Sequence, residues 1–199
     1  MRGKSVRIYR KRKRKLQEEE TRLRITEAAV ELHRTVGPAN TKITDVADRA
    51  GVSRMTVYNH FPTDADLLRA CSSHWVAQHE FPDPTRWAAV GDPQDRLRSA
   101  LTDLYRWYRS TEDMMGNVLR DVSTVPPLQQ VMEERWRPYM EQVVRILAAG
   151  RPVGPGGGEQ FEAALRVVVD FHTWKVLAGS ILDDEAAAEL GTQMIAAVR

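Results

Sequence analysis

Apolar residues recur at intervals of three and four positions along most of the chain, which is the spacing of one face of an α-helix. Ile25, Ala28, Ala29, Leu32 and Val36 form such a stripe, which ends at a Gly-Pro pair. Similar stripes follow to the C-terminus, and the Asn-Gly and Asp-Gly pairs typical of β-hairpins do not occur. The pattern therefore predicts an all-α fold of about nine helices.

Residues 41–68 contain two short helical segments separated by a glycine. Val46, Ala47 and Ala50 share one side of the first segment and Gly51 follows, at a turn that favours φ > 0. Ser53 occupies the N-cap position of the second segment. From Thr63, a T-x-x-D sequence resembles a capping box and opens a further helix, predicted to run to about residue 80. This arrangement predicts a helix-turn-helix followed by another helix.

The second segment has an unusual outward face. Val57 and Phe61 point to one side, toward the expected core. The other residues supply hydrogen-bond donors and aromatic rings without any carboxylate, which suits a helix that enters the major groove of DNA. These outward residues are Arg54, Met55, Thr56, Tyr58, Asn59 and His60.

Residues 21–73 resemble the DNA-binding domain of the TetR family of bacterial transcription regulators. The matching elements are Ile25-Thr26-Glu27-Ala28-Ala29, Gly37, Thr44-Asp45-Val46-Ala47, Ala50-Gly51-Val52-Ser53 and Thr56-Val57-Tyr58-Asn59-His60-Phe61. The resemblance implies an N-terminal three-helix DNA-binding domain over residues 18–80. It also implies a C-terminal helical domain for ligand binding and dimerisation over residues 81–199.

Two residues depart from the family pattern. His33 stands where an apolar aromatic residue is frequent, so the packing of the first helix differs. Asp64 stands where the family usually has a lysine that contacts phosphate. That contact is therefore not expected here, although the amides of a helix N-terminus still attract anions.

The resemblance assigns DNA contacts to individual residues. Arg54 is the best candidate to read a guanine edge, because its planar guanidinium matches O6 and N7. Met55 is placed to touch a thymine methyl group. For Tyr58 the alternative is partial burial with only its hydroxyl exposed, and for His60 it is capping of the helix C-terminus. The other candidates, expected mainly to hold phosphates, are Lys42, Thr44 (at the expected N-cap of the first segment), Ser53, Thr56, Tyr58, Asn59 and His60.

Beyond a break at residues 81–84, which contain two prolines, further helices are predicted. One opens at Pro93, a shorter one contains Met114 and Met115, and a long one follows Pro126-Pro127. Residues 150–158 form a glycine-rich linker. The last two helices are predicted at about 159–182 and 184–198.

The helix at 159–182 has apolar residues on two sides, and a helix of this kind must be buried on both. One side carries Phe161, Leu165, Val168, His172 and Val176, and the other carries Val167, Phe171, Trp174, Ala178 and Ile181. One side can pack inside its own domain while the other meets a second copy of the chain. The family resemblance implies a homodimer through the last two helices, whereas the alternative is a central helix of a monomeric bundle.

The family also implies a small effector bound inside the C-terminal domain. Aromatic and methionine side chains suit an apolar or aromatic ligand, with His172 as a candidate polar anchor. At helical spacing such residues also form ordinary core. The candidates are Trp107, Tyr108, Met114, Met115, Trp136, Tyr139, Met140, Phe171, His172 and Trp174.

The net charge of +2 hides a strong asymmetry. Residues 2–15 hold nine basic side chains and no acidic one, so the rest of the chain is net negative. Blocks of like charge repel one another and stay disordered until a polyanion binds, so residues 1–17 are predicted to be a disordered basic arm that contacts DNA phosphates or a minor groove. The alternatives are a solvated tail or a start placed too far upstream.

The remaining composition narrows the function classes. A single cysteine, Cys71, precludes an intrachain disulfide. The sequence shows neither an apolar run long enough to span a membrane nor a signal peptide, which favours the cytoplasm. No nucleophile elbow, zinc-protease motif, phosphate-binding loop or paired-cysteine metal site occurs, so we expect no enzyme and no cofactor.

Together these features predict a homodimeric transcription regulator that binds a pseudo-palindromic double-stranded DNA operator and leaves it when an unknown effector binds. A transcriptional activator of the same family is the first alternative. The second is a protein that binds DNA without sequence preference, mainly through its basic arm.

Overall fold

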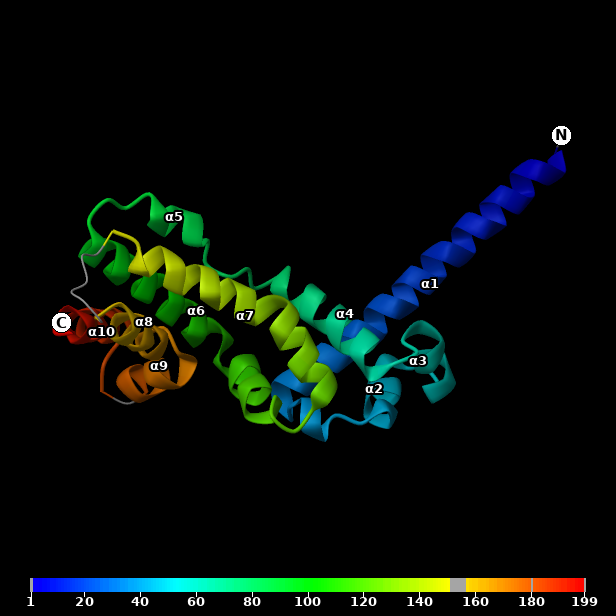
Figure 1. Cartoon of the computed structure of the whole chain (residues 1–199). Coiled ribbons are helices and arrows are strands. Elements are labelled where there is room, and N and C mark those ends of the chain that lie inside the picture. Colours follow the sequence, from blue (N-terminus) through cyan, green and yellow to red (C-terminus); the bar gives the residue numbers. More distant parts are fainter. Residues whose placement is uncertain (1, 151–156, 180, 199) are drawn as a thin grey trace. The chain divides into compact units, whose positions relative to one another are not determined.

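The computed structural model describes residues 2–150, 157–179 and 181–198, and these form ten α-helices and one short 3-10 helix (Figure 1). The all-α prediction is therefore confirmed. Residues 151–156 of the predicted linker lie outside the described residues. The elements are α1 (Arg2–Thr35), η1 (Pro38–Asn40), α2 (Ile43–Ala50), α3 (Arg54–His60), α4 (Asp64–Val76), α5 (Pro84–Ala88), α6 (Pro93–Asp121), α7 (Pro126–Ala148), α8 (Gly157–Val168), α9 (Phe171–Ala178) and α10 (Asp184–Ala196).

The chain divides into two compact units. Unit 1 consists of residues 1–79 and 116–132, and unit 2 consists of residues 80–115 and 133–199. Helices α6 and α7 therefore each contribute residues to both units.

The core of unit 1 is formed where α1 packs against α2 and α4. Ile25 and Ala29 of α1 are completely buried there with Val46 of α2 and Val57 of α3. Phe61, directly after α3, closes the same cluster. These are the apolar positions that the helical spacing selected, so the hydrophobic effect holds the helix-turn-helix on the second half of α1.

The turns of unit 1 follow the predicted chemistry. Gly51 has φ 66°, and its amide donates to the carbonyls of Ala47 and Asp48 at the end of α2. Ser53 caps α3 by accepting a hydrogen bond from the amide of Thr56. Thr63 and Asp66 form a complete capping box at the start of α4. Each of these local predictions is confirmed.

Several boundaries in unit 1 differ from the prediction. Helix α1 includes residues 2–17, for which the charge pattern predicts a disordered arm, so Glu18, Glu19 and Glu20 lie inside a helix instead of at its start. Lysine and arginine are good helix formers, and the Arg14–Glu18 pair (3.0 Å) links successive turns. Lys42 occupies the N-cap position of α2 without a side-chain cap hydrogen bond, so Thr44 lies inside the first turn. Helix α4 ends at Val76 and not near residue 80.

The end of α6 completes unit 1 through polar contacts with the chain that follows α1. Asn117 Nδ2 donates to the carbonyl of Arg34 at 2.7 Å, and Arg120 Nη2 donates to the carbonyl of Val36 at 3.2 Å. The carboxylate of Asp121 accepts from the amide of Ala39 at 3.0 Å. Gly37 has φ 91°, and a Cβ atom there would collide with Arg120 and Asp121, so this junction requires glycine.

Unit 2 contains two departures from the predicted helices. Met114 and Met115 belong to α6, which is continuous over 29 residues, so the separate short helix predicted there is wrong. The single helix predicted at 159–182 is also wrong, because α8 and α9 are separated at Asp170, which caps α9. The hydroxyls of Tyr105 and Tyr108 donate to the carbonyls of Val168 and Val169, at 2.7 and 2.6 Å. They satisfy backbone acceptors that the break leaves free.

Helix α10 is joined to α6 by a series of ion pairs. Arg109 pairs with Asp184 at 3.0 Å, Arg98 pairs with Glu189 at 2.8 Å, and Arg106 pairs with Glu185 between them. Asp184 also accepts from the indole of Trp174 at 3.0 Å. One side of α10 is therefore used inside the chain. Among the described residues, no helix is both long and apolar enough to cross a membrane.

Candidate nucleic-acid interface

Helix α3 presents a chemically selective outer surface. It is seven residues long, and Val57 is its one buried residue. Met55 is 68% exposed and Tyr58 is 41% exposed, which is unusual for large apolar or aromatic side chains on a solvated helix. Residues 53–61 contain no aspartate or glutamate. The helix thus combines donors and apolar groups without the negative charge that would repel phosphate.

Both ends of α3 are fixed by hydrogen bonds. At the N-terminus, Ser53 Oγ accepts from the Thr56 amide at 3.1 Å and lies 2.9 Å from the Thr56 hydroxyl. At the C-terminus, Arg22 of α1 donates to the His60 carbonyl at 2.6 Å. The same guanidinium lies 4.1 Å from the centre of the Phe61 ring, a cation–π contact. A cation at a helix C-terminus also complements the helix dipole.

Arg24 fixes the C-terminal end of α2 in a similar way, because its Nη1 donates to the Ala50 carbonyl at 3.3 Å. Two arginines of α1 thereby hold the ends of α2 and α3, and neither was identified from the sequence. The sequence contains one signal, an Arg-x-Arg pair just before the first apolar stripe. That signal alone does not say which carbonyls the arginines reach, because the contacts join residues 26 and 38 positions apart.

The structure brings the predicted DNA-contacting residues to α3 and the start of α2. Thr44 is half-buried and its hydroxyl donates to Asp45 at 3.2 Å. The alternative expected for His60 is capping of the C-terminus of α3. In the structure, Arg22 donates a hydrogen bond to the His60 carbonyl at that end. Asp64 is exposed in the first turn of α4. The exposed members of the predicted set are Ser53, Arg54, Met55, Tyr58 and Asn59, together with Lys42, and the half-buried members are Thr44, Thr56 and His60.

Most of the predicted effector-contacting residues lie in an aromatic cluster of unit 2. Trp107 stacks on Trp136 with ring centres 5.8 Å apart. Phe81, which the sequence analysis did not select, contacts both indoles and stacks on Tyr139 at 4.7 Å. Buried members of the predicted set are Trp107, Tyr108, Met114, Met115, Phe171 and Trp174, and half-buried members are Trp136, Tyr139 and Met140.

His172 does not serve as a polar anchor inside this cluster. Its side chain is 68% exposed, and its ring Nδ1 lies 3.2 Å from a carboxylate oxygen of Asp170. The break between α8 and α9 accounts for this position, because it places His172 in the first turn of a new helix. Tyr108 also differs from a ligand-facing group, since its hydroxyl is already bonded to Val169 and burial raises the pKa of that hydroxyl well above its usual value.

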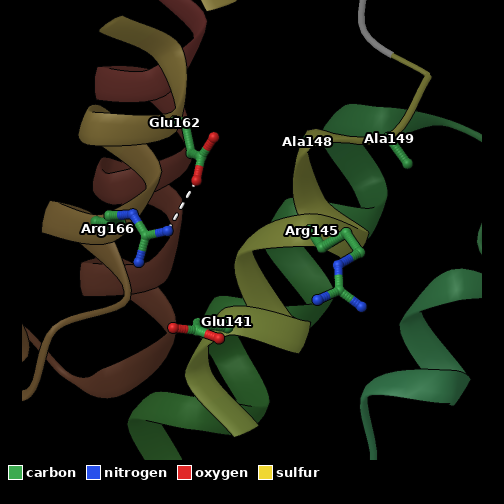
Figure 2. A pocket seen from close by; sticks show the side chains of 6 residues that line it. All are labelled: Glu141, Arg145, Ala148, Ala149, Glu162 and Arg166. Atoms are coloured by element: carbon green, nitrogen blue, oxygen red, sulfur yellow. Dashed lines mark hydrogen bonds and ion pairs between the residues drawn. The ribbon is translucent and has the colours of Figure 1, made fainter. Parts of the chain in front are cut away.

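Two cavities of unit 2 are lined by other residues. One of about 450 Å³ lies between α7 and α8, and Figure 2 shows its Glu162–Arg166 ion pair on α8 beside the charged residues of α7. The other, of about 300 Å³, has a mixed lining in which Leu97, Leu147 and Phe161 lie beside the polar residues Asp92, Gln94 and Thr192.

The described residues contain no cluster of three or more histidine, cysteine, aspartate or glutamate side chains able to hold a metal ion. Cys71 is buried in unit 1, and burial raises the pKa of its thiol to about 12. A thiol of this kind is a structural residue and not a nucleophile.

Comparisons with known proteins agree with this geometry. Residues 25–71 match the family model described as bacterial regulatory proteins, tetR family. Among curated proteins, none matches the sequence significantly. Three solved structures share the fold at identities that show the fold alone.

NalD of Pseudomonas aeruginosa, the secondary repressor of the MexAB-OprM multidrug efflux pump, is 21% identical with a TM-score of 0.59, covering 90% of this chain and 95% of NalD. PfmR of Thermus thermophilus, a TetR family transcriptional regulator, is 19% identical with a TM-score of 0.60, covering 86% of this chain and 96% of PfmR. A transcriptional regulator of Rhodococcus sp. Rha1 is 20% identical with a TM-score of 0.58, covering 87% of this chain and 95% of that one. Residues 25–71 therefore match the helix-turn-helix domain of bacterial regulatory proteins of the tetR family, and the chain as a whole shares the fold of transcription regulators such as PfmR and NalD.

Proposed function

We propose that the protein is a homodimeric, ligand-responsive repressor that occupies a pseudo-palindromic operator through α3 of each protomer. The observation that carries this proposal is the surface of α3, which is exposed, free of carboxylates and fixed at both ends. A helix held in this way keeps its side chains in one geometry, and sequence reading requires such geometry. Such a regulator acts in the cytoplasm, where it meets both the chromosome and small metabolites.

Within this proposal, the residues of α3 divide into two roles. Arg54 lies at the N-terminal end of α3, the part of a recognition helix that contacts base edges. It reads a guanine, and the neighbouring Met55 contacts a thymine methyl group. The remaining contacts position the helix on phosphates without reading sequence. They come from Lys42, Thr44, Ser53, Thr56, Tyr58, Asn59 and His60.

Dimerisation is proposed through the C-terminal helices. Large apolar side chains are exposed on α8, α9 and α10 and on the segment between the last two, and a second copy of the chain would cover them. Because α8 and α9 are separate helices, the exposed set differs from either side of the single helix predicted from the sequence. Its members are Val167, Val176, Ile181, Leu190 and Met194.

We place the effector in unit 2. The cavity of about 300 Å³ supports a small ligand with both apolar and polar groups, because Leu97, Leu147 and Phe161 line it together with Asp92, Gln94 and Thr192. The aromatic cluster of Trp107, Trp136 and Tyr139 remains the predicted alternative, reached if those rings separate. In either case the ligand must bind the conformation that is free of DNA more tightly than the conformation that binds DNA. Only this difference in affinity shifts the equilibrium between the two conformations. Repression fits the role given to NalD by its description, whereas an activator of the same family would differ in operator position.

The test is selection of bound sequences from a random pool of duplex DNA at near-physiological salt. The proposal expects an inverted repeat whose half-sites are separated by about one helical turn or a multiple of it. Recovery of a single half-site would contradict the dimeric operator. Recovery of no motif would favour the protein that binds DNA nonspecifically, provided that a ligand-free sample, refolded after denaturation, gives the same result.

A further inference from the structure

Residues 9–20 of α1 form a helical stretch with no buried side chain. The buried residues of α1 begin at Ile25, and every residue from 9 to 20 is exposed. Figure 1 shows this part of α1, in dark blue, extending beyond the α2, α3 and α4 helices of the same unit. A helix extended in this way contributes nothing to the core, so its sequence is free to serve another surface.

That surface is strongly basic on all sides. Residues 10–15 are six consecutive lysines and arginines, all exposed, and six consecutive positions surround a helix completely. Glu18 and Glu19 neutralise the last two, Arg14 at 3.0 Å and Lys15 at 3.6 Å. Among the described residues, the other four have no carboxylate partner. They are Arg10, Lys11, Arg12 and Lys13.

The basic segment begins close to the C-terminal end of α3. Arg22 of α1 contacts the His60 carbonyl at 2.6 Å, which fixes the point where α1 leaves the helix-turn-helix. From Arg22 to Arg10 the helix rises about 18 Å, the length of about five base pairs of DNA. A protomer with α3 in the major groove therefore has this charge within reach of neighbouring phosphates.

We propose that the N-terminal segment of α1, residues 2–17, binds as a helix to the phosphate backbone next to the half-site that α3 reads. The inference rests on the proposed function and extends it by adding a second DNA contact outside the helix-turn-helix. Charge complementarity selects DNA as the occupant, because nine basic residues and no acidic residue lie between positions 2 and 15. Contact all around the helix is not required, since phosphates on one side suffice and the remaining charges attract the polyanion at longer range.

A membrane surface fits this helix less well. From residue 9 onward, where side-chain exposure is described, its exposed large apolar residues before the core are Tyr9, Leu16 and Leu23, which are spaced seven positions apart and make one narrow stripe. A helix that lies in a membrane interface needs a wide apolar face beside its basic one. The stripe is too narrow to serve as that face.

The first experiment compares the wild-type protein, a glutamine variant and a control variant on the selected operator. The six residues Arg10, Lys11, Arg12, Lys13, Arg14 and Lys15 are all replaced by glutamine, and affinity is measured from low to high salt. Operators carry flanks of about 2 or about 12 base pairs on each side, the longer flank exceeding the reach of the segment. A control variant replaces three exposed arginines of unit 2 by glutamine (R137Q, R145Q and R166Q), which removes positive charge outside the segment.

The wild-type protein is expected to bind the long-flank operator at least about tenfold more tightly than the short one at low salt. The glutamine variant should bind both operators alike. The slope of log affinity against log salt should fall by about 0.9 for each phosphate that the variant no longer neutralises, up to about 5 in total. Equal affinity of the wild type for both operators, or an unchanged slope in the variant, would overturn the proposal. A tenfold preference of the wild type for anionic phospholipid vesicles over the long-flank duplex would overturn it as well.

The second experiment tests the helical form with one matched pair. Arg12→Gln and Arg12→Pro remove the same charge, but proline also breaks a helix at this position. Binding through a helix predicts that Arg12→Pro loses several-fold more affinity for the long-flank operator than Arg12→Gln. Equal losses would overturn the helical contact in favour of an extended arm. Preference for the selected operator over a shuffled sequence reports on α3 and should survive in all these variants, so its absence would identify a failure of the proposed function instead.

Discussion

Under the proposed function, Arg54 is the residue on which sequence reading by α3 most depends. It is exposed at the first position of the helix, directly after the Ser53 cap. Replacement by alanine should weaken operator binding by about 1–3 kcal/mol and relax the preference at one base pair in each half-site. Quantitative binding to operators with every single-base change would measure both effects.

Arg54→Lys is the matched control, since it keeps the charge but removes the planar fork that matches guanine. Retained phosphate attraction with relaxed base preference is the expected outcome for lysine. If Arg54→Ala weakened binding equally on operator and shuffled DNA, with no base affected, Arg54 would be a phosphate contact and the reading role would be wrong.

His33 makes the stability of unit 1 sensitive to acid. Burial lowers the pKa of His33 to about 4, while the nearby Asp121 carboxylate partly opposes the shift. Between pH 6.5 and 4 the unfolded chain binds a proton at this position that the folded chain does not, so stability falls as pH falls through this range. Below pH 4 the burial of His33 lowers the free energy of unfolding by about 3 kcal/mol, and above pH 6.5 its protonation has no effect on stability.

Urea unfolding of the wild type and of His33→Gln at pH 7.5, 6 and 5 tests this expectation. The glutamine variant has no proton to bind, so its stability should fall much less over this interval. The pKa values of Asp121 and Glu31 are lowered, chiefly by hydrogen bonds from Arg120 and Arg34 against the opposing effect of burial, so these carboxylates add their own losses only at more acidic pH. Parallel pH profiles for the two proteins would show that His33 is not the group responsible.

Residue-level prediction from sequence succeeded where the controlling interaction is local. Gly51, Ser53 and Thr63 each act on backbone groups within a few positions, and their turn chemistry is readable from residue type. Arg22 and Arg24 were missed because their carbonyl partners are distant in sequence. Only the folded helix-turn-helix brings those carbonyls to α1.

At the scale of elements, helix boundaries were least predictable where tertiary contacts decide them. Apolar spacing is continuous through residues 161–178, and it predicts one helix there. The break at Asp170 depends on two tyrosine hydroxyls of α6 that bond Val168 and Val169. The opposite error occurred in α6, because the polar residues 109–113 interrupt its apolar stripe and suggested an end where the helix continues.

Tyr108→Phe tests how much the α8–α9 break depends on α6. The mutation removes the donor from the buried Val169 carbonyl while keeping the aromatic ring in the cluster. An unsatisfied buried acceptor should lower the free energy of unfolding by about 1–3 kcal/mol, measured by urea denaturation.

Tyr139→Phe is the control, because its hydroxyl donates to the carbonyl of Pro82 at 2.9 Å from a half-buried side chain. Water can replace that donor, so the loss should stay below about 1 kcal/mol. Equal stability of Tyr108→Phe and the wild type would mean that the break does not depend on Tyr108 and is held by Asp170, the packing of α9 and the remaining bond from Tyr105 to Val168.

For the whole molecule, the sequence could not show which residues group together in space. The division into units joins residues 116–132 to the helix-turn-helix, although they follow the first segment of unit 2 along the chain. Asn117, Arg120 and Asp121 make this connection through backbone groups at residues 34–39. Backbone groups carry no residue-specific signal, so sequence spacing gives no indication of such contacts.

Assembly into a dimer is the prediction that concerns the whole molecule, and α10 provides a direct test. Its acidic residues are paired with α6 within the chain, whereas Leu190 and Met194, one turn apart, are exposed. If a second copy covers these two side chains, Leu190→Glu combined with Met194→Glu places two carboxylates in an apolar interface. The variant should be a monomer by sedimentation equilibrium and should bind the full operator at least about tenfold more weakly, because each α3 then binds its half-site alone.

Ala88→Glu combined with Arg86→Glu is the control, since it adds two carboxylates to exposed positions of α5 in the same unit. This variant should remain dimeric. The circular dichroism and unfolding midpoint of both variants establish that each is folded, because the substituted side chains are exposed in the single chain. If the glutamate variant of α10 stayed dimeric, the interface would lie elsewhere. The exposed apolar residues of α8 and α9, such as Val176 at 80% exposure, would then need a different partner.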